Sequence, residues 1–166
     1  MRRLLAVAAL GGLALAGAGC SGRPVPPVAA AHPSSAPPVS RAASPYAANT
    51  HEVCAAVNAV VADGVTRFGT DVGTMAGHIA GGNQPEADKS RTAALSRLTE
   101  LTGKVRGAGR PAADPVLASA VGSVADRFAA LAADPTLLAG VKTVADVPAV
   151  NQRVTAAADP LTGVCV

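Results

Sequence analysis

The fold is decided by residues 53–79, VCAAVNAVVADGVTRFGTDVGTMAGHI. Small or apolar residues recur here every three or four positions, as they do on one face of an α-helix. Asn49 followed by Glu52 has the spacing of a capping box, which predicts where the helix starts, and Gly81-Gly82 predicts where it stops. The residues of the stripe are Val53, Val57, Val60, Gly64, Phe68, Val72, Met75 and Ile79.

Three further main helices are predicted downstream, each introduced by a polar residue and a proline in the first turn, with the aspartates of the last two signals as caps and Glu86 favourable near the positive end of the first. Their start signals are Asn83-Gln84-Pro85-Glu86, Asp114-Pro115, and Asp146 with Pro148. The second helix is expected to end at Gly107 and Gly109, and the last at Asp159-Pro160. The apolar stripes are Ala94, Leu98, Leu101 and Val105; Leu117, Val121, Val124, Phe128 and Leu131; and Val147, Val150, Val154 and Ala157.

A further Asp-Pro pair, Asp134-Pro135, repeats the start signal and predicts one or two helical turns through Ala139. Four main helices with short connections favour an up-and-down bundle. The predicted fold is therefore all-α, a four-helix up-and-down bundle with one extra short helix. The first helix would be much longer than the fourth, and the short helix after Asp134 is expected to cover the excess.

The cysteines give an independent reason for an even number of helices. In a four-helix up-and-down bundle the end of the last helix lies beside the start of the first. Cys54 is in the first predicted helix and Cys165 follows the last, so the two would come within the separation that a disulfide needs. The alternative is that both are reduced and buried as small apolar residues.

Gly69, Gly73 and Gly77 form a ridge of small residues at every fourth position of the first helix. Each glycine lowers helix propensity by about 1 kcal/mol relative to alanine. The ridge indicates close helix approach, either inside the bundle, which we favour, or to a partner helix. A break in the helix near Gly69 is the remaining interpretation.

The N-terminus has the pattern of a secretory signal peptide, predicted for residues 1–19. Arg2 and Arg3 precede an apolar run, and small residues lead to Cys20. Residues 16–20, AGAGC, resemble the bacterial lipobox, and that resemblance implies cleavage before Cys20 and a diacylglycerol on its sulfur. Lipidation of Cys20 would also account for an odd cysteine in an exported chain. Conventional cleavage near residue 18 or 19, giving a free secreted protein, is the alternative.

Residues 20–48 are expected to be the lipidated cysteine and a disordered tether, because proline, serine and alanine dominate and no apolar periodicity is visible. The folded domain is predicted for residues 49–166. Four of the 14 basic residues precede residue 49, so ten remain in the domain beside eleven acids. This near-neutral balance, with one tyrosine and two phenylalanines in the chain, argues against a nucleic-acid partner.

The sequence contains no recognisable catalytic motif, phosphate-binding loop or Cys-x-x-Cys pair. We therefore expect no catalytic residues, no metal site and no cofactor, and a protein that is not an enzyme. His51, three residues before Cys54, is interpreted as an exposed first-turn residue rather than as a metal ligand with that cysteine. His78 beside Met75 has the residue types of a haem-ligand pair, but a surface histidine near a helix C-terminus is the favoured interpretation.

The signal segment, the two framing cysteines and the ending DPLTGVC (159–165) resemble those of small actinobacterial lipoproteins. That resemblance implies an anchor on the extracytoplasmic face of the cell membrane, and it supplies a location rather than an activity. The expected function is non-enzymatic display of a helical interaction or structural module to an envelope protein. The alternative is a carrier of a small apolar ligand or haem in the bundle core, bound near Phe68, Met75, His78 and Phe128.

Overall fold

The computed structural model describes residues 44–165. The expected signal peptide, the lipidation site at Cys20 and most of the expected tether lie outside these residues. Between residues 44 and 165 all regular structure is helical. The elements are α1 (Ala47–Ala80), α2 (Gln84–Gly109), α3 (Pro115–Ala133), the 3-10 turn η1 (Val144–Asp146), α4 (Val147–Ala156) and the 3-10 turn η2 (Asp159–Leu161). The predicted all-α class and its four main helices are confirmed.

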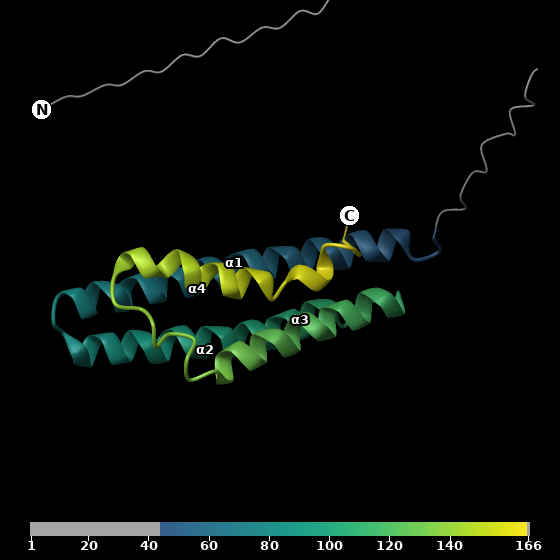
Figure 1. Ribbon diagram of the computed structural model, residues 1–166. Coiled ribbons are helices and arrows are strands. Elements are labelled where there is room, and N and C mark those ends of the chain that lie inside the picture. Colours follow the sequence, from purple (N-terminus) through teal and green to yellow (C-terminus); the bar gives the residue numbers. More distant parts are fainter. Residues whose placement is uncertain (1–43, 166) are drawn as a thin grey trace, which may run out of the picture. The chain divides into compact units, whose positions relative to one another are not determined.

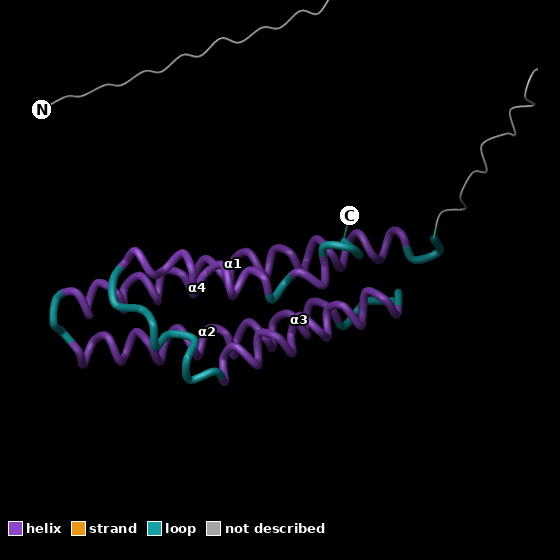
Figure 2. Tube along the Cα trace, in the orientation of Figure 1, coloured by secondary structure: helices purple, strands orange, loops and turns teal. Residues whose placement is uncertain are grey.

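The helices lie side by side along much of their length (Figure 1). Helix α1 packs against α2 and α4, while α3 packs against α2 and against η2. The connections form short loops at the helix ends, and the longest joins α3 to α4 (Figure 2). The predicted difference in length is also present, because α1 has 34 residues and α4 has ten.

Two of the predicted start signals contain a residue whose side chain caps the helix, Asn83 for α2 and the expected cap Asp114 for α3. The Asn83 side chain accepts a hydrogen bond from the Glu86 amide at 3.5 Å, and the Asp114 side chain accepts one from the Val116 amide at 2.8 Å. The turn between α1 and α2 depends on Gly82, whose φ of 71° is a left-handed conformation that favours glycine. The same turn places the backbone N–H of Asn83 where it donates a hydrogen bond to the backbone carbonyl of His78, at 2.9 Å.

Three local predictions are wrong. The Asp146 side chain does not cap α4, because its carboxylate accepts instead from the preceding Lys142 and Thr143 amides, at 3.0 and 2.8 Å. Helix α1 begins at Ala47, so Asn49 lies inside the helix and does not cap it. The segment after Asp134 forms consecutive turns instead of a short helix. A local feature accompanies these turns: the Asp134 carboxylate accepts hydrogen bonds from both the amide and the hydroxyl of Thr136, at 2.8 and 2.6 Å. These bonds stabilise a turn around the aspartate.

The core is made mostly of valine, leucine and alanine side chains around two phenylalanines. The largest fully buried side chains are those of Phe68, Phe128 and Met75. The connection between α3 and α4 contributes to this core as well, because Leu137, Leu138 and Val141 are buried. The segment after Asp134, expected to cover apolar surface as a short helix, therefore buries apolar side chains but forms turns.

The glycines of α1 differ in what surrounds them. The helix continues through Gly69 without a break. A Cβ at Gly69 would lie 2.8 Å from the Asn151 amide nitrogen of α4, so this glycine permits close packing inside the domain. A Cβ at Gly73 or Gly77 would have no neighbour within 4 Å. Of the three glycines in the ridge, only Gly69 therefore fits the favoured interpretation, close packing inside the domain.

By length and composition, α3 is the one helix within residues 44–165 that is apolar enough to cross a membrane. Its mean hydropathy is 1.4, and 33% of the apolar window is buried. The core helix of a folded domain has the same properties, and α3 packs against α2 and η2 here.

Candidate functional site

The first candidate site is the corner where the two ends of the domain meet. Cys54, in the second turn of α1, and Cys165, after η2, lie at disulfide-bonding distance with their Cα atoms 5.5 Å apart. They are 111 residues apart in the sequence. Figure 1 shows the C-terminus beside the first half of α1. A sulfur bonded in this pair would not serve as a metal-binding thiolate, so the pair favours the interpretation of His51 as an exposed residue over a metal site with Cys54.

A hollow of about 490 Å³ lies beside the cysteine pair. Its polar lining comes from Ser44, Thr50, His51, Asn58 and Asp114. The Asp114 carboxylate already accepts the hydrogen bond that begins α3. Among the described residues, no hydrogen bond joins His51 to Asp114. The hollow is therefore a mixed polar and apolar surface site in which His51 and Asp114 do not form a hydrogen-bonded acid–base pair.

No metal site is formed in the part of the chain that the structure describes. Within residues 44–165 no group of three or more His, Cys, Asp or Glu side chains is close enough together to hold a metal ion.

The residues expected to bind a ligand do not share one surface hollow. Phe68, Met75 and Phe128 have no exposed surface and form the centre of the core. His78 is partly exposed in the last turn of α1, where its position agrees with the surface interpretation. The five surface hollows that we compared are lined by other residues. The alternative function, a carrier that binds a small apolar ligand or haem in the core, stays a prediction.

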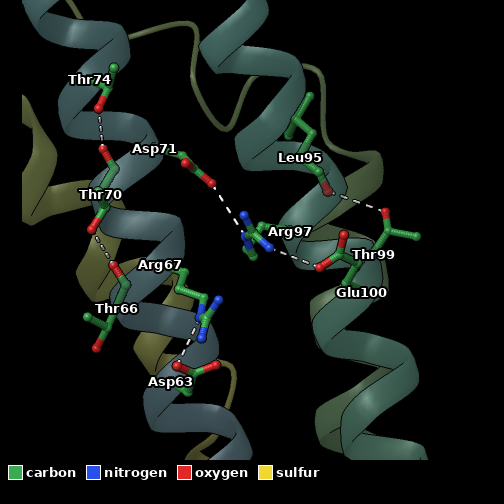
Figure 3. Close-up of polar contacts among 10 residues, drawn as sticks. All are labelled: Asp63, Thr66, Arg67, Thr70, Asp71, Thr74, Leu95, Arg97, Thr99 and Glu100. Carbon is green, nitrogen blue, oxygen red and sulfur yellow. Dashed lines mark hydrogen bonds and ion pairs between the residues drawn. The ribbon is translucent and has the colours of Figure 1, made fainter.

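A second candidate surface is the polar face shared by α1 and α2 (Figure 3). The Arg97 guanidinium of α2 connects the two helices, because its Nε lies 3.5 Å from an Asp71 carboxylate oxygen on α1. Its Nη1 lies 3.1 Å from a Glu100 oxygen on α2 itself. The Arg97 and Asp71 side chains are 29% and 24% exposed, so this pair is better shielded from water than an ordinary surface pair.

Three exposed threonines follow the side of α1 that points away from α2 (Figure 3). The hydroxyls of Thr66, Thr70 and Thr74 each donate to the carbonyl one helical turn earlier, at 2.8, 3.1 and 3.0 Å. Their donor capacity is therefore used inside the helix. This side of α1 presents small side chains, and their hydroxyl protons are already donated to carbonyl groups of the same helix.

Two of the three carboxylates whose pKa is lowered hold turns together, while the third, Glu86 in the first turn of α2, is paired with Lys89. Hydrogen bonds from the Thr136 hydroxyl and amide lower the pKa of Asp134, and the bond and charge of Arg153 add to the effect. Bonds from the Lys142 and Thr143 amides, and then from the Thr143 hydroxyl, lower the pKa of Asp146. Both residues stabilise the α3–α4 connection.

Sequence reasoning missed the role of Asn49. Its side-chain amide donates to the Pro111 carbonyl at 3.1 Å and accepts from the Ala113 amide at 2.8 Å. These two bonds attach the α2–α3 loop to the start of α1. The partners lie more than 60 residues away in the sequence, so no local pattern could have indicated them.

Comparison with protein families, with curated proteins and with solved structures found no match for this chain.

Proposed function

We propose that this protein is a lipid-anchored envelope protein on the extracytoplasmic face of the cell membrane, where it displays a helical domain with a non-enzymatic binding or structural role. The finer description of that domain, an up-and-down four-helix bundle, is part of the proposal. The membrane is the first partner, through the lipid on Cys20, and an envelope protein is the second.

The observation that carries the proposal is the division of the three cysteines. Cys54 and Cys165 lie at disulfide-bonding distance, and disulfides persist in oxidising, extracytoplasmic compartments. Cys20 is then left without a pairing partner in the chain, directly after an apolar run and a stretch of small residues. Lipidation is the chemistry that such a context indicates.

The roles of the acidic side chains support a non-enzymatic domain. Asp114, Asp134 and Asp146 each accept backbone hydrogen bonds that start a helix or close a turn. Asp63 and Asp71 are paired with arginines on the surface of α1 and α2. These carboxylates have structural partners in the folded domain.

The experiment is metabolic labelling of the full chain with an alkyne-bearing fatty acid in a bacterial host that processes lipoproteins. The wild type and Cys54→Ser should both take up the label and sediment with membranes. Cys20→Ser should remain unlabelled and keep its leader. Label on the Cys20→Ser chain, or no label on the wild type, would contradict the anchor. Cross-linking in cells would then identify the protein partner.

A further inference from the structure

The side of the domain between α3 and α4 is not closed by helix packing. Helix α4 packs on α1, and α3 packs on α2 and η2, but α3 and α4 hardly approach each other along their backbones. A shallow hollow of about 360 Å³, widely open to solvent, lies in this gap. We call it the α3/α4 groove.

The groove has an apolar floor. Ala130 and Leu131 come from α3, Ala156 is the last residue of α4, and Ala157 follows it. Ala157 is 5% exposed and Leu131 is partly buried against the core. The small alanine side chains leave room for an aliphatic group of a ligand.

Two arginines stand at the rim of this floor, Arg127 from α3 and Arg153 from α4. The one carboxylate that lines the groove, that of Asp134, lies 3.1 Å from Arg153 Nη2 and also accepts two hydrogen bonds from Thr136. Arg127 has no ion-pair partner among residues 44–165. The two arginines and the one aspartate therefore leave the rim with one positive charge in excess. A guanidinium has five N–H donors, and Arg153 uses one of them on Asp134.

We propose that the α3/α4 groove binds a single-chain anionic amphiphile, such as a fatty-acid carboxylate, with its aliphatic chain over the alanine floor and its carboxylate between Arg127 and Arg153. Charge complementarity carries this choice. An uncharged apolar ligand would leave the excess rim charge unused, whereas a carboxylate forms charge-assisted hydrogen bonds with guanidinium groups. This site is distinct from the core carrier site expected near Phe68, and it does not depend on the lipid anchor.

The test uses the full chain in its own membrane fraction and a diazirine-bearing decanoate as the probe. Adducts should saturate with concentration and map to peptides that contain residues 130–131 and 156–157. Arg127→Gln with Arg153→Gln should raise the half-saturating concentration about tenfold or more, because hydrogen bonds between charged partners are lost. Arg67→Gln is the matched control, since Arg67 is an exposed arginine paired with Asp63 on α1, and it should leave labelling unchanged.

Ala130→Trp separates binding from folding, because Ala130 is exposed and a large side chain there fills the groove without changing charge. It should abolish the saturable labelling. The alcohol analogue of the probe should label at least tenfold more weakly than the carboxylate. Adducts spread evenly along the chain, or labelling that is insensitive to both arginine changes and to Ala130→Trp, would overturn the proposal. So would equal labelling by the alcohol.

Discussion

Alanine at Gly64 and alanine at Gly73 should shift the stability of the domain in opposite directions, although both residues lie in α1. A Cβ at Gly64 would lie 2.5 Å from one methyl carbon of Leu101 and 2.9 Å from the other. Leu101 is 2% exposed, so its methyl groups have little space into which to move. A Cβ at Gly73 would meet nothing within 4 Å.

The magnitudes follow from two opposing terms. Replacing a mid-helix glycine by alanine contributes about 1 kcal/mol at either position. Overpacking against Leu101 costs about 1–3 kcal/mol at Gly64 alone. We therefore expect Gly73→Ala to stabilise the domain by about 0.5–1 kcal/mol and Gly64→Ala to destabilise it by about 1 kcal/mol.

Urea unfolding of the full chain, followed by circular dichroism with the cysteines oxidised, gives the required free energies. A double-mutant cycle with Leu101→Ala isolates the contact. Leu101→Ala alone should cost about 2–5 kcal/mol because it leaves a cavity. Adding Gly64→Ala should then be favourable, because the new methyl group enters that space. Strict additivity, or equal stabilisation by the two alanine changes, would refute the packing of α1 on α2 described above.

Three other changes test other parts of the structure. Opening the Cys54–Cys165 pair with a reductant, or by Cys54→Ala with Cys165→Ala, should cost up to about 5 kcal/mol, the chain-entropy value for a loop of 111 residues; an unchanged urea midpoint would contradict a formed disulfide. Asn49→Ala should cost about 1–2 kcal/mol through the two bonds to the α2–α3 loop, and Asn58→Ala is a control on the same helix whose loss of stability should be smaller. Because the folded-state pKa of Asp146 is below its ordinary value of 3.8, its contribution to stability is present above that value and is lost as the pH falls through the lowered pKa. Thermal unfolding of Asp146→Asn should therefore depend less on pH below about 3.8 than that of the wild type, and identical pH profiles would be evidence against this role.

The helices were predictable because their signals are local and agree with one another. A stripe of apolar residues fixes the buried face of α1, and the Asn83 and Asp114 caps need only residues two or three positions away. The cysteine separation was predictable for a different reason. The prediction rests on four helices running up and down, an arrangement that would bring the two ends of the domain together, and the observed Cα separation of 5.5 Å agrees with it.

The wrong predictions arise where one local pattern has two physical outcomes. Asp134-Pro135 has the same residues as Asp114-Pro115, and both carboxylates accept from the amide two residues on, but the Thr136 hydroxyl is an additional donor to Asp134 that Val116 does not supply to Asp114. Asn49 has the residue type of a cap, but its partners are the distant residues 111 and 113. In both cases a hydrogen-bond partner outside the cap pattern, the Thr136 hydroxyl or the backbone of the α2–α3 loop, accompanies an outcome that the pattern does not predict.

The candidate sites depend on positions that only the folded chain brings together. Arg127 and Arg153 belong to different helices, and nothing in their local sequences indicates that they share the rim of one groove. Likewise, the fourfold spacing of Gly69, Gly73 and Gly77 does not reveal that only the first of them has a close neighbour.

The central claim is that one cysteine holds a lipid and the other two form a disulfide. The most direct test is the intact mass of the protein purified from membranes, measured under denaturing conditions before and after reduction. The account predicts a chain that begins at Cys20, with the added mass of a diacylglycerol, and that gains two hydrogen atoms on reduction. A chain that begins elsewhere without lipid, or whose mass does not change on reduction, would contradict it.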